Sequence, residues 1–287
     1  MTTIAGFFLL HETYAPVLLE RKTAKIRRET GNQDLHAEFS RPSPQRLLLL
    51  FLRPLKLLAF SPIVLLLSLH MAITYSYIYL LFTTVPTVFE NVYGFSQSTV
   101  GLVFLGLGVG MMVGLVICLL GIPKYIAAKR AAGAAYTSET LLPMMIPGAF
   151  IIPVSLFWYG WSIECNAPYI VSIIATGLFG ASFLSAFVGS SYFREHNIIL
   201  TQIFEVPIQV YLVDVFTIYA ASATAATVIL RSLVGAFLPL AGPPMFQALG
   251  LGWGSSLLGF ISLAMLPVPF VLVKYGERLR KKYPVEL

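Results

Sequence analysis

Long uncharged runs of apolar residues limit what this chain can fold into more than any other feature of its sequence. Such runs cover residues 62–81, 100–122, 144–161 and 257–273. A helix of about 20 mostly apolar residues crosses the hydrocarbon core of a membrane, where the backbone must satisfy its hydrogen bonds internally. Charged residues make up 11% of the chain, against about 25% in a soluble domain. The sequence therefore predicts an all-α integral membrane protein.

The apolar pattern divides the chain into three parts. Residues 1–19 are interpreted as the end of a truncated transmembrane helix, and residues 20–60 as a basic cytoplasmic loop. Residues 61–287 are expected to hold six spans, the first capped by Ser61. These spans are predicted at about 62–82, 97–121, 143–161, 168–187, 220–240 and 253–273. Two interpretations of residues 20–30 stay open: an amphipathic helix on the cytoplasmic leaflet, or a solvated linker.

Most basic residues lie in alternate connections between the spans. Of the nineteen Lys and Arg residues, nine lie in 21–56, three in 124–130 and five in 274–282. The intervening loops without Lys or Arg are 83–96, 160–168 and 241–254. Positive charge marks cytoplasmic loops, and Trp favours the membrane boundary. The basic segments and the C-terminus are therefore predicted to be cytoplasmic, with three residues near the outer boundary: Trp158, Trp161 and Trp253.

The second predicted span contains glycines four residues apart, at Gly106, Gly110 and Gly114. Small residues at this spacing let two helix backbones approach closely in a membrane. A phosphate-binding loop would also require Gly-Lys-Ser/Thr, which the sequence lacks. We therefore interpret the three glycines as a helix-packing surface.

Motifs typical of enzymes and ATP-driven pumps are missing from the sequence. Its four histidines form no His-x-x-x-His spacing, and neither Gly-x-Ser-x-Gly nor a phosphate-binding loop occurs. We therefore expect no catalytic residue, no metal, no cofactor and no nucleic-acid partner.

Several segments match one transporter family. Residues 11–19, His-Glu-Thr-Tyr-Ala-Pro-Val-Leu-Leu, resemble the E-T-Y-x-P-x-L-L signature that closes the sixth helix of one group of fungal transporters. This group is the drug:proton antiporter-like family of the major facilitator superfamily (MFS). Further similar segments are Leu-Leu-Phe-Thr-Thr at 80–84, Pro-Met-Met-Ile-Pro-Gly at 143–148, Tyr-Leu-Val-Asp at 211–214, the stretch 220–232, and Gly-Trp-Gly-Ser-Ser-Leu-Leu-Gly-Phe at 252–260. The resemblance covers nearly the whole chain.

The resemblance implies the C-terminal half of a twelve-helix MFS protein: a six-helix half-bundle plus the tail of the preceding helix. Transporters of this architecture bind substrate at mid-membrane between repeats. The implied function is efflux of small hydrophobic or cationic compounds, drugs or secondary metabolites, driven by protons and located in the plasma membrane. A full cavity would need a second half, from a homodimer or another protein. The competing hypothesis is a membrane interaction protein that does not transport, or an inactive gene-model fragment.

Residues 188–205 interrupt this pattern with charged and polar side chains. They are interpreted either as a cytoplasmic loop or as an insertion. In similar proteins the tenth helix continues into a Pro-Ile-Gln-x-Tyr-Leu-x-Asp segment, and joining Phe187 to Val206 restores that continuity. We therefore hypothesise that residues 188–205 are a translated, retained intron.

Five residues are candidates for substrate contact: His70, Thr74, Tyr77, Gln209 and Arg231. An ionisable residue inside a span, such as Arg231, is costly and is a functional candidate by default. The alternative is that Arg231 forms a fixed interhelical pair or bonds to backbone carbonyls. His70, Thr74 and Tyr77 share one helix face and are expected to line a drug cavity in which tyrosine rings stack on the substrate. The alternative for these three residues is a lipid-facing position or packing between helices with a satisfied histidine.

Three further residues are weaker candidates. Tyr75 and Tyr79 lie in the first span beside the residues already named. Asp214, like Gln209, matches a family position near the inner gate. Asp214 has an alternative interpretation as a helix-end residue paired with a cytoplasmic Lys or Arg.

Overall fold

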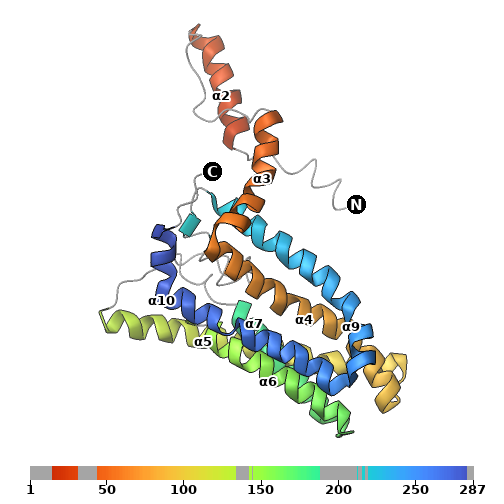
Figure 1. Cartoon of the computed structure of the whole chain (residues 1–287). Coiled ribbons are helices and arrows are strands. Elements are labelled where there is room, and N and C mark those ends of the chain that lie inside the picture. The colour runs from red at the N-terminus through yellow and green to blue at the C-terminus, as the bar shows by residue number, and fades with distance from the viewer. Residues whose placement is uncertain are drawn as a thin grey trace. The chain divides into compact units, whose positions relative to one another are not determined.

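The computed structural model divides into two compact units, Met1–Leu52 and Arg53–Leu287. It describes residues 15–31, 44–133, 142–143, 145–187, 212, 215–216 and 219–282. These residues form helices and no strand, as Figure 1 shows. Predicted features at residues 188–205, Gln209 and Asp214 lie outside the described residues.

The first unit contains α2 (Ala15–Thr30), a basic helix with Arg27 and Arg28 in its last turn. Cations there interact favourably with the helix dipole. Lys25 Nζ lies 3.9 Å from Glu29 Oε1 on the exposed surface. Gly31 follows with φ 67°, the left-handed conformation that commonly ends a helix. Residues 20–30 are therefore helical, and contact between this helix and a membrane leaflet stays a prediction.

The next helix, α3 (Pro44–Phe60), crosses the boundary between the two units. The second unit then contains α4 (Pro62–Tyr93), α5 (Gln97–Ala131), α6 (Met145–Glu164), α7 (Tyr169–Phe187), α9 (Ala220–Met265) and α10 (Pro267–Lys282). In the described chain, four segments are long and apolar enough to cross a membrane: Pro62–Tyr93, Gln97–Ala131, Met145–Glu164 and Ala220–Gly276. A shorter apolar helix covers Tyr169–Phe183. The chain is therefore an all-α, multi-pass membrane protein, as predicted.

The start of α4 agrees with the sequence-based expectation. The Ser61 hydroxyl oxygen accepts a hydrogen bond from the Val64 backbone N–H at 3.5 Å, and Pro62 is the first helical residue. Proline suits this position because its missing N–H would have no intrahelical partner. The helix continues to Tyr93 and stops at Gly94, whose φ is 68°. It is thus longer than the predicted span of 62–82, and it ends where Gly94 adopts a left-handed conformation.

Helix α9 contains the predicted span 220–240 and the first part of the predicted span 253–273, with a break between them at Gly250. Its φ of 77° and ψ of 169° are not helical. Figure 1 shows the later, darker blue part of α9 running back in roughly the opposite direction to the earlier, lighter part. The segment Ala220–Gly276 has 57 residues, more than twice the length of about 20 that one crossing needs. Two crossings therefore fit within it.

The glycines of α5 form a close contact with α7, which confirms the predicted packing surface. A Cβ atom added at Gly110 would overlap the carbonyl oxygen of Gly177, and one at Gly114 would overlap that of Ala181. Only a residue without a side chain allows the two backbones to approach this closely. These glycines therefore hold α5 against α7.

The later part of α9 is also bound to α6. The Gly252 N–H donates a hydrogen bond of 3.1 Å to Glu164 Oε2, and Trp161 Nε1 donates one of 3.1 Å to the Ser256 hydroxyl. The Trp161 and Trp253 rings lie 5.9 Å apart in an edge-to-face arrangement. Gly252 lies in the first turn after the break, where backbone N–H groups have no intrahelical acceptor. Glu164 therefore caps this helical segment from a neighbouring helix.

Candidate functional site

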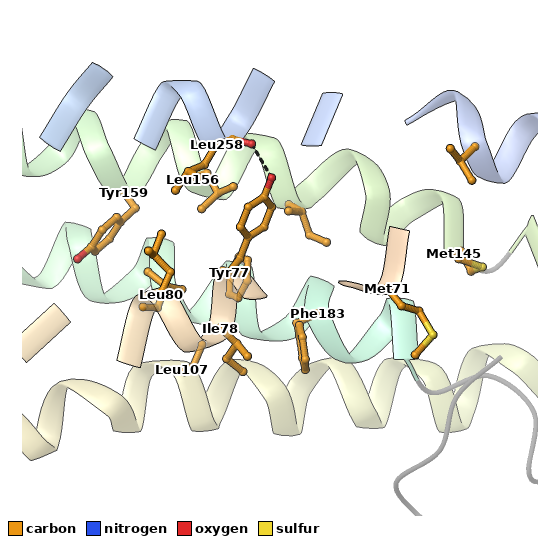
Figure 2. Close-up of a cluster of buried hydrophobic side chains, with 14 of the residues drawn as sticks. Met71, Tyr77, Ile78, Leu80, Leu107, Met145, Leu156, Tyr159, Phe183 and Leu258 are labelled. Atoms are coloured by element: carbon orange, nitrogen blue, oxygen red, sulfur yellow. Dashed lines mark hydrogen bonds between the residues drawn. The ribbon is translucent and has the colours of Figure 1, made fainter. Parts of the chain in front are cut away.

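The three candidate residues of α4 lie inside the helix bundle. His70 and Thr74 are each 4% exposed, and Tyr77 is 1% exposed. The Tyr77 hydroxyl donates a hydrogen bond of 2.9 Å to the Leu258 carbonyl oxygen of α9 (Figure 2). Neither ring nitrogen of His70 has a hydrogen-bond partner among the described residues. Contact between these side chains and a substrate stays a prediction.

A different side of α4 carries a second set of side chains: Tyr75, Tyr79 and Phe82. With 3.6 residues per turn, this set is centred about 140° around the helix axis from the set formed by His70, Thr74 and Tyr77. The Tyr79 side chain is 41% exposed and that of Phe82 is 45% exposed. This part of α4 therefore remains open in the described chain.

Arg231 of α9 lies against this open surface. Its guanidinium carbon, Cζ, is 4.4 Å from the centroid of the Tyr75 ring, within the range of a cation–π interaction. The Tyr75 and Tyr79 hydroxyl oxygens are 3.0 Å apart and share a hydrogen bond. The glycine one turn after Arg231, Gly235, faces the same two rings: an added Cβ would lie 3.7 Å from Tyr75 and 3.8 Å from Tyr79. Arg231, Tyr75 and Tyr79 thus form one cluster between α4 and α9.

Further aromatic rings extend the cluster toward α5 and α7. Ring centroids are 6.3 Å apart for Tyr79 and Phe82, 5.5 Å for Phe82 and Phe104, and 6.5 Å for Tyr75 and Phe183. Such separations are typical of favourable aromatic pairs. We define the aromatic–arginine face as the following six residues: Tyr75, Tyr79, Phe82, Phe104, Phe183 and Arg231.

The cavity that the described residues form beside this face is too small for an organic compound. The cavity next to Phe104, lined by apolar side chains of α4, α5 and α7 and by Thr176, has a volume of about 10 Å³. That volume is near the minimum for one water molecule. The exposed rings of Tyr79 and Phe82 therefore offer the accessible apolar surface, and Arg231 supplies a positive charge beside it.

The described residues contain no group of three or more His, Cys, Asp and Glu side chains arranged to hold a metal ion. The chemistry available at the aromatic–arginine face is therefore aromatic stacking, hydroxyl hydrogen bonding and attraction of negative charge. These are properties of a binding surface.

Sequence reasoning named every member of the central cluster but did not find its arrangement. Tyr75, Tyr79 and Phe82 repeat the i, i+4, i+7 spacing of His70, Thr74 and Tyr77. Spacing alone does not identify which stripe is buried, because lipid and protein interior are similarly apolar. The contact of Tyr75 with Arg231 joins residues on different helices, and no sequence motif marks it.

Comparison with known proteins identifies relatives along nearly the whole chain. No family model matches it. The MFS-type transporter atr4 of Stereocaulon alpinum is 46% identical over 281 residues, covering 97% of this chain and 48% of that protein. The MFS-type transporter penM of Penicillium rubens is 45% identical, and the match covers 97% of this chain and 52% of that protein. The MFS-type transporter phm3 of Pyrenochaetopsis sp is 47% identical, and the match covers 99% of this chain and 55% of that protein. The chain spans about half the length of the curated relatives it matches.

Proposed function

We propose, from the premise that this chain is homologous to fungal MFS-type transporters, that it takes part in moving small compounds across a membrane. The proposed activity is efflux of hydrophobic or cationic molecules, drugs or secondary metabolites, coupled to protons. Its relatives are named as transporters, which favours transport over an enzymatic function.

The observation that carries this proposal is the aromatic–arginine face. It combines an ionisable residue within a membrane helix with exposed aromatic rings. Ionisable residues in such helices commonly face a cavity or a substrate pathway. We propose that the substrate contacts Tyr79, Phe82 and Arg231. The Tyr75 ring contacts the Arg231 guanidinium and positions it. His70, Thr74, Tyr77 and Gln209 remain predicted contacts with no structural support of their own.

The membrane setting completes the proposal. The proposed location is the plasma membrane, with the basic segments and the C-terminus in the cytoplasm, because positive charge marks that side. The pairing of Trp161 with Trp253 supports an outer boundary at that end of α6. A closed cavity requires a second wall opposite the aromatic–arginine face, from a second copy of this chain or from another protein.

Accumulation assays test the proposal. The chain is produced in fungal cells that lack their own efflux pumps, and the intracellular level of aromatic compounds with neutral, cationic and anionic groups is measured. We expect lower accumulation of at least one compound than in cells with an empty vector. Tyr79→Ala should abolish most of that difference, because it removes an exposed ring of the face. Phe150→Ala, which removes a ring of similar exposure from α6, is the matched control and should retain it.

Unchanged accumulation of every compound, with the chain folded in the plasma membrane, would contradict transport by this chain. A decrease that Phe150→Ala and Tyr79→Ala abolish equally would show that the substrate binds elsewhere.

A further inference from the structure

Arg231 has no acidic counterpart within the described membrane helices. Between Pro62 and Met265, the described carboxylate residues are Glu90 and Glu164. Glu164 accepts the Gly252 N–H at the outer end of α6. Glu90 is fifteen positions after Tyr75 in α4, which places its backbone about 22 Å further along the helix. Neither carboxylate forms an ion pair with Arg231 in the described structure.

The contacts of Arg231 leave part of its guanidinium unsatisfied. One side of the group lies on the Tyr75 ring, with Cζ 4.4 Å from the centroid. Its Nε atom is buried and has no hydrogen-bond acceptor among the described residues. An aromatic ring attracts a cation but does not accept a strong N–H hydrogen bond. A charged donor removed from water without an acceptor is costly. Because the Arg231 side chain as a whole is half-buried, its guanidinium is suited to receive an acceptor from outside the described helices.

The chemistry of guanidinium indicates which acceptor fits. Its planar set of N–H donors matches the two oxygens of a carboxylate or a similar anion. The same positive charge repels an organic cation, and this repulsion is strong where the dielectric is low. The neighbouring rings of Tyr79 and Phe82 offer apolar surface to the rest of the molecule. Tyr75 holds the guanidinium plane, which reduces the freedom that Arg231 would lose when it binds an anion.

We propose that the aromatic–arginine face binds amphipathic organic anions, with the anionic group on Arg231 and a planar apolar part on Tyr79 and Phe82. This inference rests on the proposed transport function, keeps a hydrophobic substrate and replaces the expected positive charge of that substrate with a negative one. It excludes organic cations as the preferred substrate, although composition and family resemblance alone allowed them.

Three probes with the same naphthalene ring and polar groups of different charge test the inference. They are 2-naphthoate, neutral 2-naphthalenemethanol and cationic 2-naphthalenemethylamine. Binding to the full chain is measured by calorimetry in nanodiscs of phosphatidylcholine, which carries no net charge, and empty nanodiscs give the background. We expect 2-naphthoate to bind about tenfold more tightly than the alcohol, since a charge-assisted bidentate pair contributes about this much. The amine should bind more weakly than the alcohol.

Variants at Arg231 separate charge recognition from a structural role. Arg231→Gln should reduce 2-naphthoate binding to the level of the alcohol, while alcohol binding stays unchanged. Arg231→Lys should retain part of the anion preference, because it keeps the charge and loses the planar donor set. Circular dichroism and size-exclusion profiles establish that each variant is folded. Tyr79→Ala should lower the binding affinity for all three probes by a similar factor, because it removes an apolar contact and no charge.

The outcomes distinguish this inference from the transport proposal. One contrary outcome is that all three probes bind equally, that Tyr79→Ala weakens their binding and that Arg231→Gln does not. This outcome would overturn the selection of anions, while the proposal that substrate binds at the aromatic–arginine face would stand. Preference for the amine would overturn the selection of anions as well. Co-purification of an anionic phospholipid with the original chain but not with Arg231→Gln would identify a lipid phosphate as the ligand of Arg231, which also overturns it. Binding of no probe by the folded chain would contradict both proposals.

Discussion

The guanidinium carbon of Arg231 in α9 lies 4.4 Å from the centre of the Tyr75 ring in α4. This contact joins two segments 156 positions apart in the sequence and holds a positive charge beside exposed aromatic rings. Cation–π pairs contribute about 0.5–2 kcal/mol, more when they are desolvated. The contact therefore positions the charge of the proposed binding face and also stabilises the packing of α4 on α9.

A double-mutant cycle of Tyr75→Leu and Arg231→Met should show coupling between the two residues. Tyr75→Leu alone leaves the guanidinium without its ring and is expected to destabilise the fold by about 1–2 kcal/mol. The double variant should lose less than the sum of the single changes, by about 0.5–2 kcal/mol. Chemical unfolding in detergent micelles measures these free energies. Tyr75→Phe, which keeps the ring, is the control and should retain the coupling; additive single effects would show that the contact contributes no stability.

A methyl group at Gly110 should separate α5 from α7. Gly110→Ala places Cβ against the Gly177 carbonyl oxygen, which backbone atoms cannot avoid without moving a helix, so we expect a loss of about 1–3 kcal/mol. Gly108→Ala is the matched control, because nothing lies within 4 Å of its added Cβ. It should be neutral or slightly stabilising, since alanine favours a helix over glycine. Similar unfolding curves for the two variants would contradict the close contact.

Much of the fold follows from the sequence. Length and hydropathy locate the spans because a membrane requires helices of defined length. Glycine spacing predicts a packing surface on α5, and the structure shows that α7 is the helix packed against it. The helix ends are less well predicted. The apolar run of α4 ends near Phe82, yet the helix continues through polar residues to Tyr93. The break inside α9 is at one glycine, Gly250, with φ 77°.

The candidate site can be predicted only in part, because its contacts depend on how the helices pack. The sequence identifies Arg231 because charge is rare in a span. It does not reveal that Tyr75 is its neighbour, since that contact depends on how α4 and α9 pack. It also leaves the buried stripe of α4 ambiguous, because His70 and Tyr79 occupy opposite parts of a helix with apolar surroundings on both sides.

The hydrogen bond from Tyr77 to the Leu258 carbonyl oxygen should have a modest effect on stability. Tyr77→Phe removes the hydroxyl and keeps the buried ring, so the cost is expected to be about 0.5–1.5 kcal/mol. Unfolding in detergent micelles measures it. Tyr275→Phe, at a tyrosine that is 40% exposed, serves as the control and should change nothing. A Tyr77→Phe variant as stable as the original chain would contradict a bond that joins α4 to α9.

Removal of the Glu164 carboxylate should loosen the start of the later part of α9. Because Glu164 Oε2 accepts the Gly252 N–H, Glu164→Ala leaves this first-turn donor unsatisfied. Hydrogen exchange over residues 250–256 is expected to accelerate about fivefold to tenfold. Glu164→Gln keeps an acceptor oxygen and should have a smaller effect. Unchanged exchange in the alanine variant would show that the N–H group is satisfied in another way.

Substitution of His70 distinguishes core packing from substrate contact. His70→Leu removes two buried nitrogens that have no described partner, and we expect stability to rise by about 1 kcal/mol. Binding of 2-naphthoate should be unchanged, because His70 is buried on α4 away from Tyr79. Calorimetry and chemical unfolding measure the two effects. Weaker binding by a folded His70→Leu variant would instead support the predicted role of His70 in the cavity.

Photolabelling tests the position of the proposed substrate face most directly. An azide-substituted 2-naphthoate is photoactivated on the full chain in phosphatidylcholine nanodiscs, and mass spectrometry maps the labelled peptides. We predict labels on α4 between Tyr75 and Phe82 and on α9 near Arg231, both suppressed by excess 2-naphthoate. Labels confined to the exposed apolar side chains of α5, including Leu105 and Met112, and unaffected by excess 2-naphthoate, would contradict this position.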